Sequence, residues 1–360
     1  MDIAYFITPH GFGHAARATA VMLEFQEIFP NIHFHIYTTV PRQFFETSLI
    51  KQFSYHKVLT DIGIVQKTPF EENIQVTIQH LKSFISSLDS QAFSISKQLV
   101  KHQCCLVLCD ISPLGIKAAK VANIPSVLIE NFRWDWIYKS YGGQLADFSN
   151  YFKESFEEAD VHIQATPFCQ KIETANLVVN PIARVPNLSK EEVRAKLNIP
   201  NQAKVVLLAL GNMVDMQYLP KKTNTNEILY FIVTGSFKEI KCEGNIIFIP
   251  QYNYLFYVDI LNASDVVIAK AGYSTIAEVY FTGISFGYVT RQNFAEMKVL
   301  CEFAHQFIPS MEILESEFQS TLWLEKVLGL LHFKKIERKQ ENGAKQIAQY
   351  IIKHATFLLS

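Results

Sequence analysis

Short apolar runs recur along the chain, and stretches with helical periodicity lie between them. Several runs are apolar at consecutive positions, which is typical of strands covered on both faces in a parallel sheet. Their alternation with helices in both halves predicts an α/β protein with two doubly wound, Rossmann-like sheets. The predicted strands are residues 3–8, 33–38, 105–109, 126–129 and 161–163, then 204–210, 229–233, 245–249, 266–269 and 284–289.

The length of 360 residues is sufficient for two domains that each bury a core. The predicted boundary is the segment LVVNPIARVPNLSKEEVRAKLNIPNQAK, residues 177–204, which is rich in proline and then shows a helix-capping signal, Ser189 followed by Glu192. We therefore expect a first domain over residues 1–180 and a second over residues 181–339. The final helical stretch, about residues 340–360, is apolar enough to pack back on the first domain.

The charge balance limits the classes of partner. The formal net charge is -1, so no overall field attracts nucleic acid or an anionic bilayer. The six cysteines form no C-x-x-C pair, and we expect them to be reduced and buried. The first apolar run is too short for a signal peptide or a membrane span. The sequence predicts a cytoplasmic protein; peripheral membrane contact through aromatic residues and the oligomeric state stay open.

The segment FITPHGFGHAARATAV, residues 6–21, leads from a strand into an alanine-rich helix through two glycines. Gly11, Gly13 and Ala16 match G-x-G-x-x-A, in which glycines permit a tight turn and the free N–H groups of the helix favour an anion or a sugar oxygen. A dinucleotide-binding fold requires an acidic residue at the end of the next strand. That strand ends HIYTTVPR, without an acid, which disfavours an NAD-dependent dehydrogenase.

His14 lies inside this turn, where the positive end of the helix dipole disfavours imidazolium and keeps the ring a neutral base near pH 7. Asp110 ends the apolar strand CCLVLCD. If the two strands are neighbours in a parallel sheet, this carboxylate accepts from one imidazole nitrogen while the other takes a proton from a bound hydroxyl. The alternative is a histidine that caps its helix and an aspartate that caps the end of its strand.

The segment AKAGYSTIAE, residues 269–278, is a second strand-to-helix turn. Gly272 follows the strand, and Ser274 and Thr275 open a helix whose N–H groups favour a diphosphate. Glu278 is close enough to the helix start for its carboxylate to accept from both hydroxyls of a ribose. The alternative is a capping box formed by Thr275 and Glu278.

Three segments together resemble a known class of enzymes: GFGHAARA, CDISPLGIKAAKVANIPSVLIENFRWDWIY and AKAGYSTIAEVYFTGISFGYVTR. They are similar to the glycosyltransferase-like N-terminal region of L-arabinokinases and, more broadly, to GT-B nucleotide-sugar glycosyltransferases, including the bacterial peptidoglycan N-acetylglucosaminyltransferase. The similarity spans roughly residues 1–310. It implies two Rossmann-like domains facing across a cleft, with the acceptor on the first and a UDP-sugar on the second. No sugar-kinase segment follows, so a kinase activity is not implied.

The resemblance also implies roles for residues of the first domain. In UDP-glycosyltransferases the histidine of the first loop deprotonates the acceptor and an aspartate after a later strand orients it; His14 and Asp110 fall on these positions. Gly11, Gly13 and Arg17 belong to the loop that would lie beside the acceptor. The family needs no catalytic metal and no cofactor other than the UDP-sugar as co-substrate, so no metal ligand is assigned.

In the second domain the resemblance implies nucleotide-binding residues. The family uses a glutamate at the position of Glu278 for the ribose, and the loop of Tyr252 would lie near the uracil. NPIAR, residues 180–184, is similar to the family's Asn-Pro-Val-Arg linker with one residue inserted before Arg184, the expected diphosphate contact. The family's second glycine-rich loop is reduced here to Gly211. The expected contacts of the donor sugar are Arg291, Gln292 and Glu296, which do not identify the sugar.

The function that these features favour is metal-independent, inverting transfer of a sugar from a UDP-sugar to an unidentified acceptor hydroxyl. Aromatic residues in PRQFFETSLI and ENFRWDWIYKSY would either line an apolar acceptor groove or belong to the core. Two alternatives remain: a UDP-sugar 2-epimerase, which shares the fold, and a non-catalytic nucleotide-sugar binding or regulatory protein, because fold does not determine function.

Overall fold

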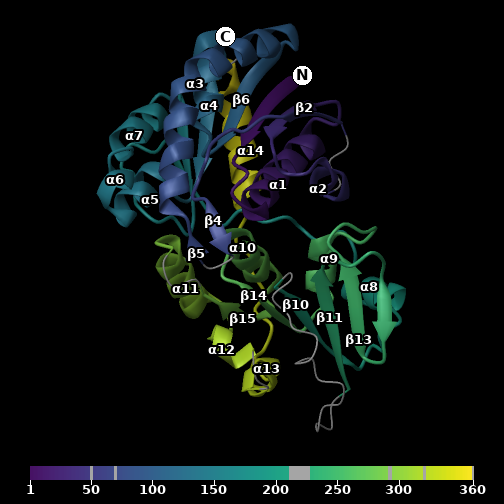
Figure 1. Cartoon of the computed structure of the whole chain (residues 1–360). Coiled ribbons are helices and arrows are strands. Elements are labelled where there is room, and N and C mark those ends of the chain that lie inside the picture. Colours follow the sequence, from purple (N-terminus) through teal and green to yellow (C-terminus); the bar gives the residue numbers. More distant parts are fainter. Residues whose placement is uncertain (49–51, 69–70, 211–227, 291–293, 319–321, 359–360) are drawn as a thin grey trace. The chain divides into compact units, whose positions relative to one another are not determined.

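The chain folds into two compact units, as seen in a computed structural model (Figure 1). The structure describes residues 1–48, 52–68, 71–210, 228–290, 294–318 and 322–358. The first unit comprises residues 1–183 and 341–360, and the second comprises residues 184–340. The sequence-based division at residue 180 assigned the terminal helix to the first of these units.

The first unit is built on a seven-stranded sheet in the order β3-β2-β1-β6-β7-β8-β9, with every pair parallel. Apart from β4 (Gln66–Thr68) and β5 (Glu71–Glu72), which form a separate hairpin, this is the strand order of a dinucleotide-binding fold with one strand added. The chain leaves the centre in both directions, so the switch point lies between β1 and β6. The seven strands are β1 (Asp2–Ile7), β2 (His33–Thr38), β3 (Phe53–Lys57), β6 (Cys104–Asp110), β7 (Ser126–Glu130), β8 (Val161–Ala165) and β9 (Leu177–Val179).

Helices connect these strands and cover the sheet. α3 packs against α4, and α1 packs against α14, as expected when right-handed connections leave the centre of a sheet in opposite directions. Every residue of α1 from His14 to Met22 is buried, because the helix contacts both β1 and α14. The helices are α1 (Phe12–Ile28), α2 (Arg42–Thr47), α3 (Ile74–Lys101), α4 (Pro113–Ala122), α5 (Trp134–Tyr141), α6 (Gly143–Ala146), α7 (Ser149–Glu157) and α14 (Gly343–Leu358).

The terminal helix α14 is held against β9 and the segment that follows it. The backbone N–H of Asn180 donates to Oε1 of Gln346 at 2.8 Å, and Nδ2 of Asn342 donates to the carbonyl of Ala183 at 2.7 Å. Gly343 lies so close to Asn180 that a side chain there would overlap its carbonyl oxygen. The last helix of the sequence is therefore part of the first unit.

The second unit has a seven-stranded sheet in the order β12-β13-β11-β10-β14-β15-β16, parallel except for the pair β12 and β13. Its switch point lies between β10 and β14. The strands are β10 (Lys204–Ala209), β11 (Leu229–Gly235), β12 (Lys241–Glu243), β13 (Ile246–Pro250), β14 (Val266–Lys270), β15 (Ser285–Val289) and β16 (Ser310–Glu312). The helices are α8 (Lys190–Lys196), α9 (Tyr257–Asn262), α10 (Tyr273–Thr282), α11 (Glu296–Phe307), α12 (Glu315–Phe318) and α13 (Leu322–Leu331).

The predicted capping signal at the start of α8 is confirmed. The backbone N–H of Glu192 donates to the hydroxyl of Ser189, and the backbone N–H of Ser189 donates to the Glu192 carboxylate at 2.8 Å. Both polar groups would otherwise be left unpaired at the helix end. This reciprocal pair stops the chain from continuing the extended segment and begins the second unit.

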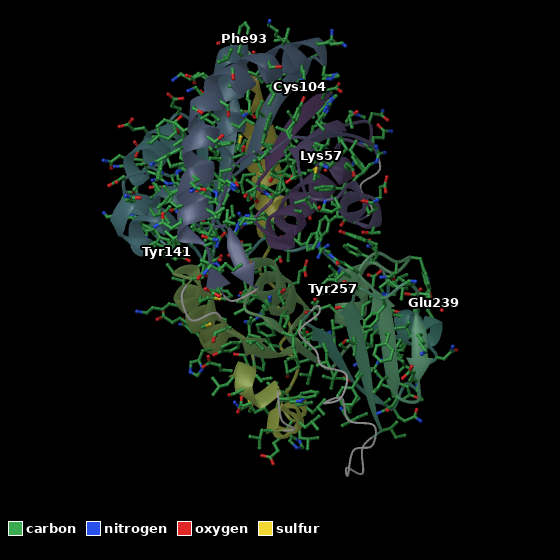
Figure 2. The ribbon with its side chains drawn as sticks, in the orientation of Figure 1. Lys57, Phe93, Cys104, Tyr141, Glu239 and Tyr257 are labelled. Atoms are coloured by element: carbon green, nitrogen blue, oxygen red, sulfur yellow. The ribbon has the colours of Figure 1, made fainter. Side chains whose placement is uncertain are left out.

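Most of the aromatic residues considered for an acceptor groove belong to the core. Phe45, Trp134 and Tyr138 are buried, whereas Phe93 lies exposed on α3 (Figure 2). All six cysteines are free, as expected, but Cys242 is exposed because the short strand β12 lies at the edge of its sheet. Within the described residues, no helix is both long and apolar enough to cross a membrane.

Candidate active site

The turn between β1 and α1 depends on Gly11, which forms the N-cap of the helix. Its φ of 88° lies in a region that residues with a side chain rarely adopt. Glycine also has no side chain with which to cap the helix, so the first N–H groups of α1 are not capped by this residue. The turn therefore leaves donors at the helix start for a polar ligand.

His14 and Asp110 meet at the switch point of the first sheet. β1 and β6 are neighbours, with Ile7 paired to Asp110, so the loops that follow both strands open at the same edge. Nδ1 of His14 lies 2.7 Å from Oδ1 of Asp110. This is the hydrogen bond predicted from the sequence, and it lies where open α/β sheets bind their ligands.

Arg17 completes this cluster from the next turn of α1. Its Nε lies 2.7 Å from Oδ2 of Asp110 and its Nη2 lies 2.8 Å from Oδ1 of the same carboxylate. Its Nη1 donates to Oδ1 of Asn131, which follows β7. Arg17 is only 1% exposed. This position corrects the expectation that Arg17 lies beside the acceptor, because its guanidinium faces the sheet and is held by Asp110.

The electrostatics of the cluster favour a neutral imidazole. Burial lowers the pKa of His14, and the charge of Arg17 lowers this pKa further, while Asp110 acts in the opposite direction. Burial alone would raise the pKa of Asp110, but Arg17 and His14 outweigh it, and the pKa is lowered. Since the carboxylate only accepts, Nδ1 of His14 is the donor, and the Nε2 lone pair is left as the basic site.

Aromatic rings lie beside His14. Phe132 meets its imidazole edge-on with the ring centres 5.6 Å apart. At the start of α1, Phe12 stacks on Phe44 with the ring centres 5.4 Å apart and remains 42% exposed. These two rings are the aromatic surface nearest in sequence to the turn, whereas Trp134 and its neighbours fill the core.

The second unit repeats the arrangement of turn and helix at its own switch point. β14 pairs with β10, and Gly272 forms the N-cap of α10 directly after β14. Ser274 and Thr275 lie half-buried in the first turn of the helix. Because the cap is Gly272, the alternative of a capping box formed by Thr275 and Glu278 is wrong.

Glu278 is buried and pairs with Arg184, the first residue of the second unit. Nε of Arg184 donates to Oε1 of Glu278 at 2.7 Å. Burial raises the pKa of Glu278, and Arg184 opposes this shift. The guanidinium also lies over the rings of Phe256 and Tyr257, at 5.3 and 5.8 Å from their centres; Tyr257 begins α9 (Figure 2). The two residues expected to bind different parts of the nucleotide thus contact each other.

The remaining predicted nucleotide contacts are only partly described. Tyr252 follows β13 and is half-buried in a turn. Glu296 is buried at the first position of α11. Gly211, Arg291 and Gln292 lie outside the described residues.

Sequence analysis did not identify Arg17 and Asn131 as partners of Asp110. One signal was available, because His14 and Arg17 are three residues apart on a helix and therefore share a face. A further buried pair also went unnoticed beside the first turn: the hydroxyl of Thr8 donates to Oδ1 of Asp61 at 2.8 Å. Burial raises the pKa of Asp61 to about 8.

Two Rossmann-like units with these strand orders, each with a glycine turn at its switch point, give the chain the GT-B fold of nucleotide-sugar glycosyltransferases. Solved structures match nearly all of it. UGT89C1 from Arabidopsis thaliana is 12% identical with a TM-score of 0.64, covering 100% of this chain and 99% of that one. MurG from Acinetobacter baumannii is 14% identical with a TM-score of 0.55, covering 98% and 99%.

The sequence itself is similar to an L-arabinokinase from Arabidopsis thaliana, at 27% identity over 344 residues. The match covers 91% of this chain and 32% of the arabinokinase, so the chain spans about a third of that relative. No protein-family profile matches the chain. These likenesses agree with the class that the sequence motifs indicated, and the solved structures bear on the fold alone.

Proposed function

We propose that the protein is a metal-independent, inverting glycosyltransferase that moves a sugar from a UDP-sugar to an acceptor hydroxyl. The observation that carries this proposal is the 2.7 Å hydrogen bond between His14 and Asp110 at the switch point of the first sheet. It combines a neutral base with a carboxylate that orients it, in a fold shared with enzymes of this chemistry. No cofactor is required beyond the UDP-sugar.

In the proposed reaction, His14 acts as the general base. Asp110 holds the ring through Nδ1, and Nε2 takes the proton of the acceptor hydroxyl as its oxygen bonds to the anomeric carbon. The bond from that carbon to the β-phosphate oxygen breaks, and UDP leaves with the electron pair. Attack from the face opposite UDP inverts the anomeric centre. Phe12 and Phe44 would offer an aromatic surface to the acceptor beside this base.

The donor would bind at the start of α10. The N–H groups of the first turn and the hydroxyls of Ser274 and Thr275 would stabilise the diphosphate as negative charge develops on it. Glu278 would accept from the ribose hydroxyls and so release Arg184, whose planar guanidinium suits a phosphate. A structure of UGT89C1 contains UDP-L-rhamnose, which supports a UDP-sugar as the donor for this chain.

The donor half of the proposal is tested by calorimetric titration with UDP, GDP, ADP and NADH. UDP should bind most tightly, and Glu278→Gln should weaken it about tenfold, or about 1.4 kcal/mol. The control is Glu243→Gln, which changes an exposed glutamate of the same unit. If UDP fails to bind, or if both variants behave like the wild type, the donor assignment is wrong.

Product analysis separates the proposal from its alternatives. A transferase consumes UDP-sugar and forms a glycoside of inverted anomeric configuration in the presence of EDTA. An epimerase would instead release a sugar with altered configuration at C2. A binding protein would saturate with UDP-sugar and leave it unchanged, an outcome that the buried pair between Arg184 and Glu278 would then explain as a permanent structural contact.

A further inference from the structure

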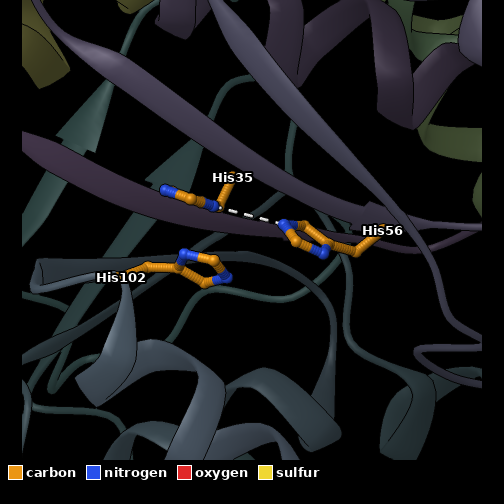
Figure 3. A group of neighbouring side chains, drawn as sticks. All are labelled: His35, His56 and His102. Atoms are coloured by element: carbon orange, nitrogen blue, oxygen red, sulfur yellow. Dashed lines mark hydrogen bonds between the residues drawn. The ribbon is translucent and has the colours of Figure 1, made fainter.

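A group of three histidines lies on the first unit, away from the proposed catalytic base. His35 belongs to β2, His56 belongs to β3, and His102 follows the last turn of α3 (Figure 3). One ring nitrogen from each lies within 4.8 Å of those of the other two. His35 pairs with Ala4 in the middle of β1, whereas His14 follows the end of that strand. The group therefore makes no use of the residues proposed for catalysis.

The hydrogen bonds around His35 fix which of its nitrogens faces the group. Nε2 of His35 lies 3.2 Å from Oδ1 of Asp2, and a carboxylate can only accept, so Nε2 carries the proton. The lone pair of the neutral ring is then on Nδ1, which lies 3.2 Å from Nε2 of His56. A carboxylate behind a histidine is the arrangement that orients metal-bound imidazoles in many proteins.

The spacing of the nitrogens is close to that of a tetrahedral metal site. Zn–N bonds of about 2.0–2.1 Å at tetrahedral angles place neighbouring nitrogens about 3.3 Å apart. The separation between His35 and His56 already has this value within 0.1 Å or so, and His102 would need only a small approach. In Figure 3 the ring of His102 lies beside those of the two strand histidines.

The surroundings also suit ligands that must be neutral before they bind a cation. Burial lowers the pKa of His56 to about 4, and the neighbouring His35, His102 and His33 contribute to this shift. His35 is buried and so held in place, while His56 and His102 are half-buried and leave the group open to solvent. An ion could enter from that side and keep water as its fourth ligand.

We propose that His35, His56 and His102 bind a divalent transition-metal ion, with Zn²⁺ the best fit to three imidazole ligands. The ion would connect the outer strands β2 and β3 to the end of α3, which are far apart in the sequence. Its role would be structural, since the proposed transfer reaction uses none of these residues. The sequence gave no such signal, because the three histidines lie in different elements without the spacing of a metal-binding motif.

The test is metal binding by the full chain, prepared without a histidine tag and stripped with EDTA. Calorimetry with Zn²⁺ should show one site with a dissociation constant in the micromolar range or below. His56→Gln and His102→Gln should each weaken binding at least tenfold. The matched control is His80→Gln, which removes an exposed histidine from α3 and should leave the affinity unchanged.

Two further readouts make the result decisive. Co²⁺ should give the visible absorption of a tetrahedral complex in the wild type and lose it in His102→Gln, and Zn²⁺ should raise the thermal unfolding midpoint of the wild type only. Because His102 is half-buried after the end of its helix, this variant keeps the fold and decides the matter even if His56→Gln unfolds. Absent binding, or binding equal in all variants, would overturn the proposal.

Discussion

At the scale of single residues, the site depends on how one carboxylate is shared. Asp110 is fully buried and accepts from both His14 and Arg17. Arg17 neutralises the carboxylate, which would otherwise raise the pKa of His14 more strongly, and its own positive charge acts in the same direction. The balance keeps His14 unprotonated at neutral pH while Nε2 remains free to accept a proton.

The first prediction concerns this balance. Replacing Arg17 with glutamine should raise the pKa of His14, because a positive neighbour is lost while Asp110 remains. It should also lower the free energy of unfolding by about 3–5 kcal/mol, the usual cost of leaving one partner of a buried ion pair alone. NMR titration of the histidine ring measures the pKa, and chemical denaturation measures the stability.

Two variants act as controls for this prediction. Arg17→Lys keeps the charge but loses the planar fork, so it should shift the pKa of His14 less. Arg42→Gln breaks an exposed pair with Glu46 and should change stability by no more than about 0.5 kcal/mol. A pKa of His14 that stays the same in Arg17→Gln would show that the guanidinium does not control the base.

A second prediction concerns Asp61, whose pKa burial raises to about 8. Asp110 adds to this shift, while Thr8 and the indole of Trp134 oppose it; the buried phenol of Tyr138 also lies near. The folded state then holds a proton that the unfolded state loses near pH 4. This contribution to stability is present at low pH and is lost as pH rises toward 8.

Asp61→Asn should remove this dependence. The free energy of unfolding of the wild type, measured relative to the variant by urea denaturation, should fall by at least about 1 kcal/mol between pH 5 and pH 8, roughly the value of one pKa unit. Parallel curves for the two proteins across this range would mean that Asp61 is ionised in the folded state.

At the scale of helices and strands, close backbone approach fixes the terminal helix. Gly343 begins α14 where its N–H donates to the carbonyl of Pro181 at 3.0 Å. A methyl group at this position would overlap the carbonyl oxygen of Asn180 and part of Ile182. We predict that Gly343→Ala lowers the free energy of unfolding by about 1–3 kcal/mol, the usual cost of forcing extra atoms into a packed contact.

The matched control is Gly272→Ala, since a methyl group at Gly272 meets nothing within 4 Å and its φ of -110° is an ordinary one. That variant should keep the stability of the wild type in thermal unfolding. Equal melting temperatures for the two variants would mean that α14 moves away from Asn180 without cost and is not fixed by this contact.

The strands also show what the sequence could predict. All ten predicted runs form strands, because central strands buried on both faces are apolar at consecutive positions. The strands β3, β9, β12 and β16 were missed, and each lies at an edge of its sheet. Edge strands are short and partly exposed, so their sequences lack this pattern; β12, for example, is exposed throughout.

The site was predictable to the same depth as the sheet. The meeting of His14 and Asp110 follows from two neighbouring parallel strands that end at one edge. The inward orientation of Arg17 and the pairing of Arg184 with Glu278 depend on side-chain packing between distant segments, which periodicity does not reveal. The histidine group proposed to bind a metal joins three elements and was hidden for the same reason.

At the scale of the whole molecule, the two units would contribute different parts of one reaction. The first unit carries a neutral histidine base at its switch point, and the second carries a helix N-terminus suited to a diphosphate. Neither feature alone transfers a sugar. The central claim is therefore that the base in the first unit activates an acceptor against a donor bound by the second.

The most direct test is the rate of UDP release from a panel of UDP-sugars with hydroxyl acceptors, measured for the wild type, His14→Gln and the exposed-histidine control His80→Gln. The account predicts saturable release by the wild type and the control. In His14→Gln, release should be slower by a factor of about 10²–10⁴, as expected for loss of a general base, with UDP affinity unchanged. Equal rates in all three proteins would contradict the assignment of His14 as the base, and bound but unconsumed UDP-sugar in the wild type would contradict the proposal that the protein is a transferase.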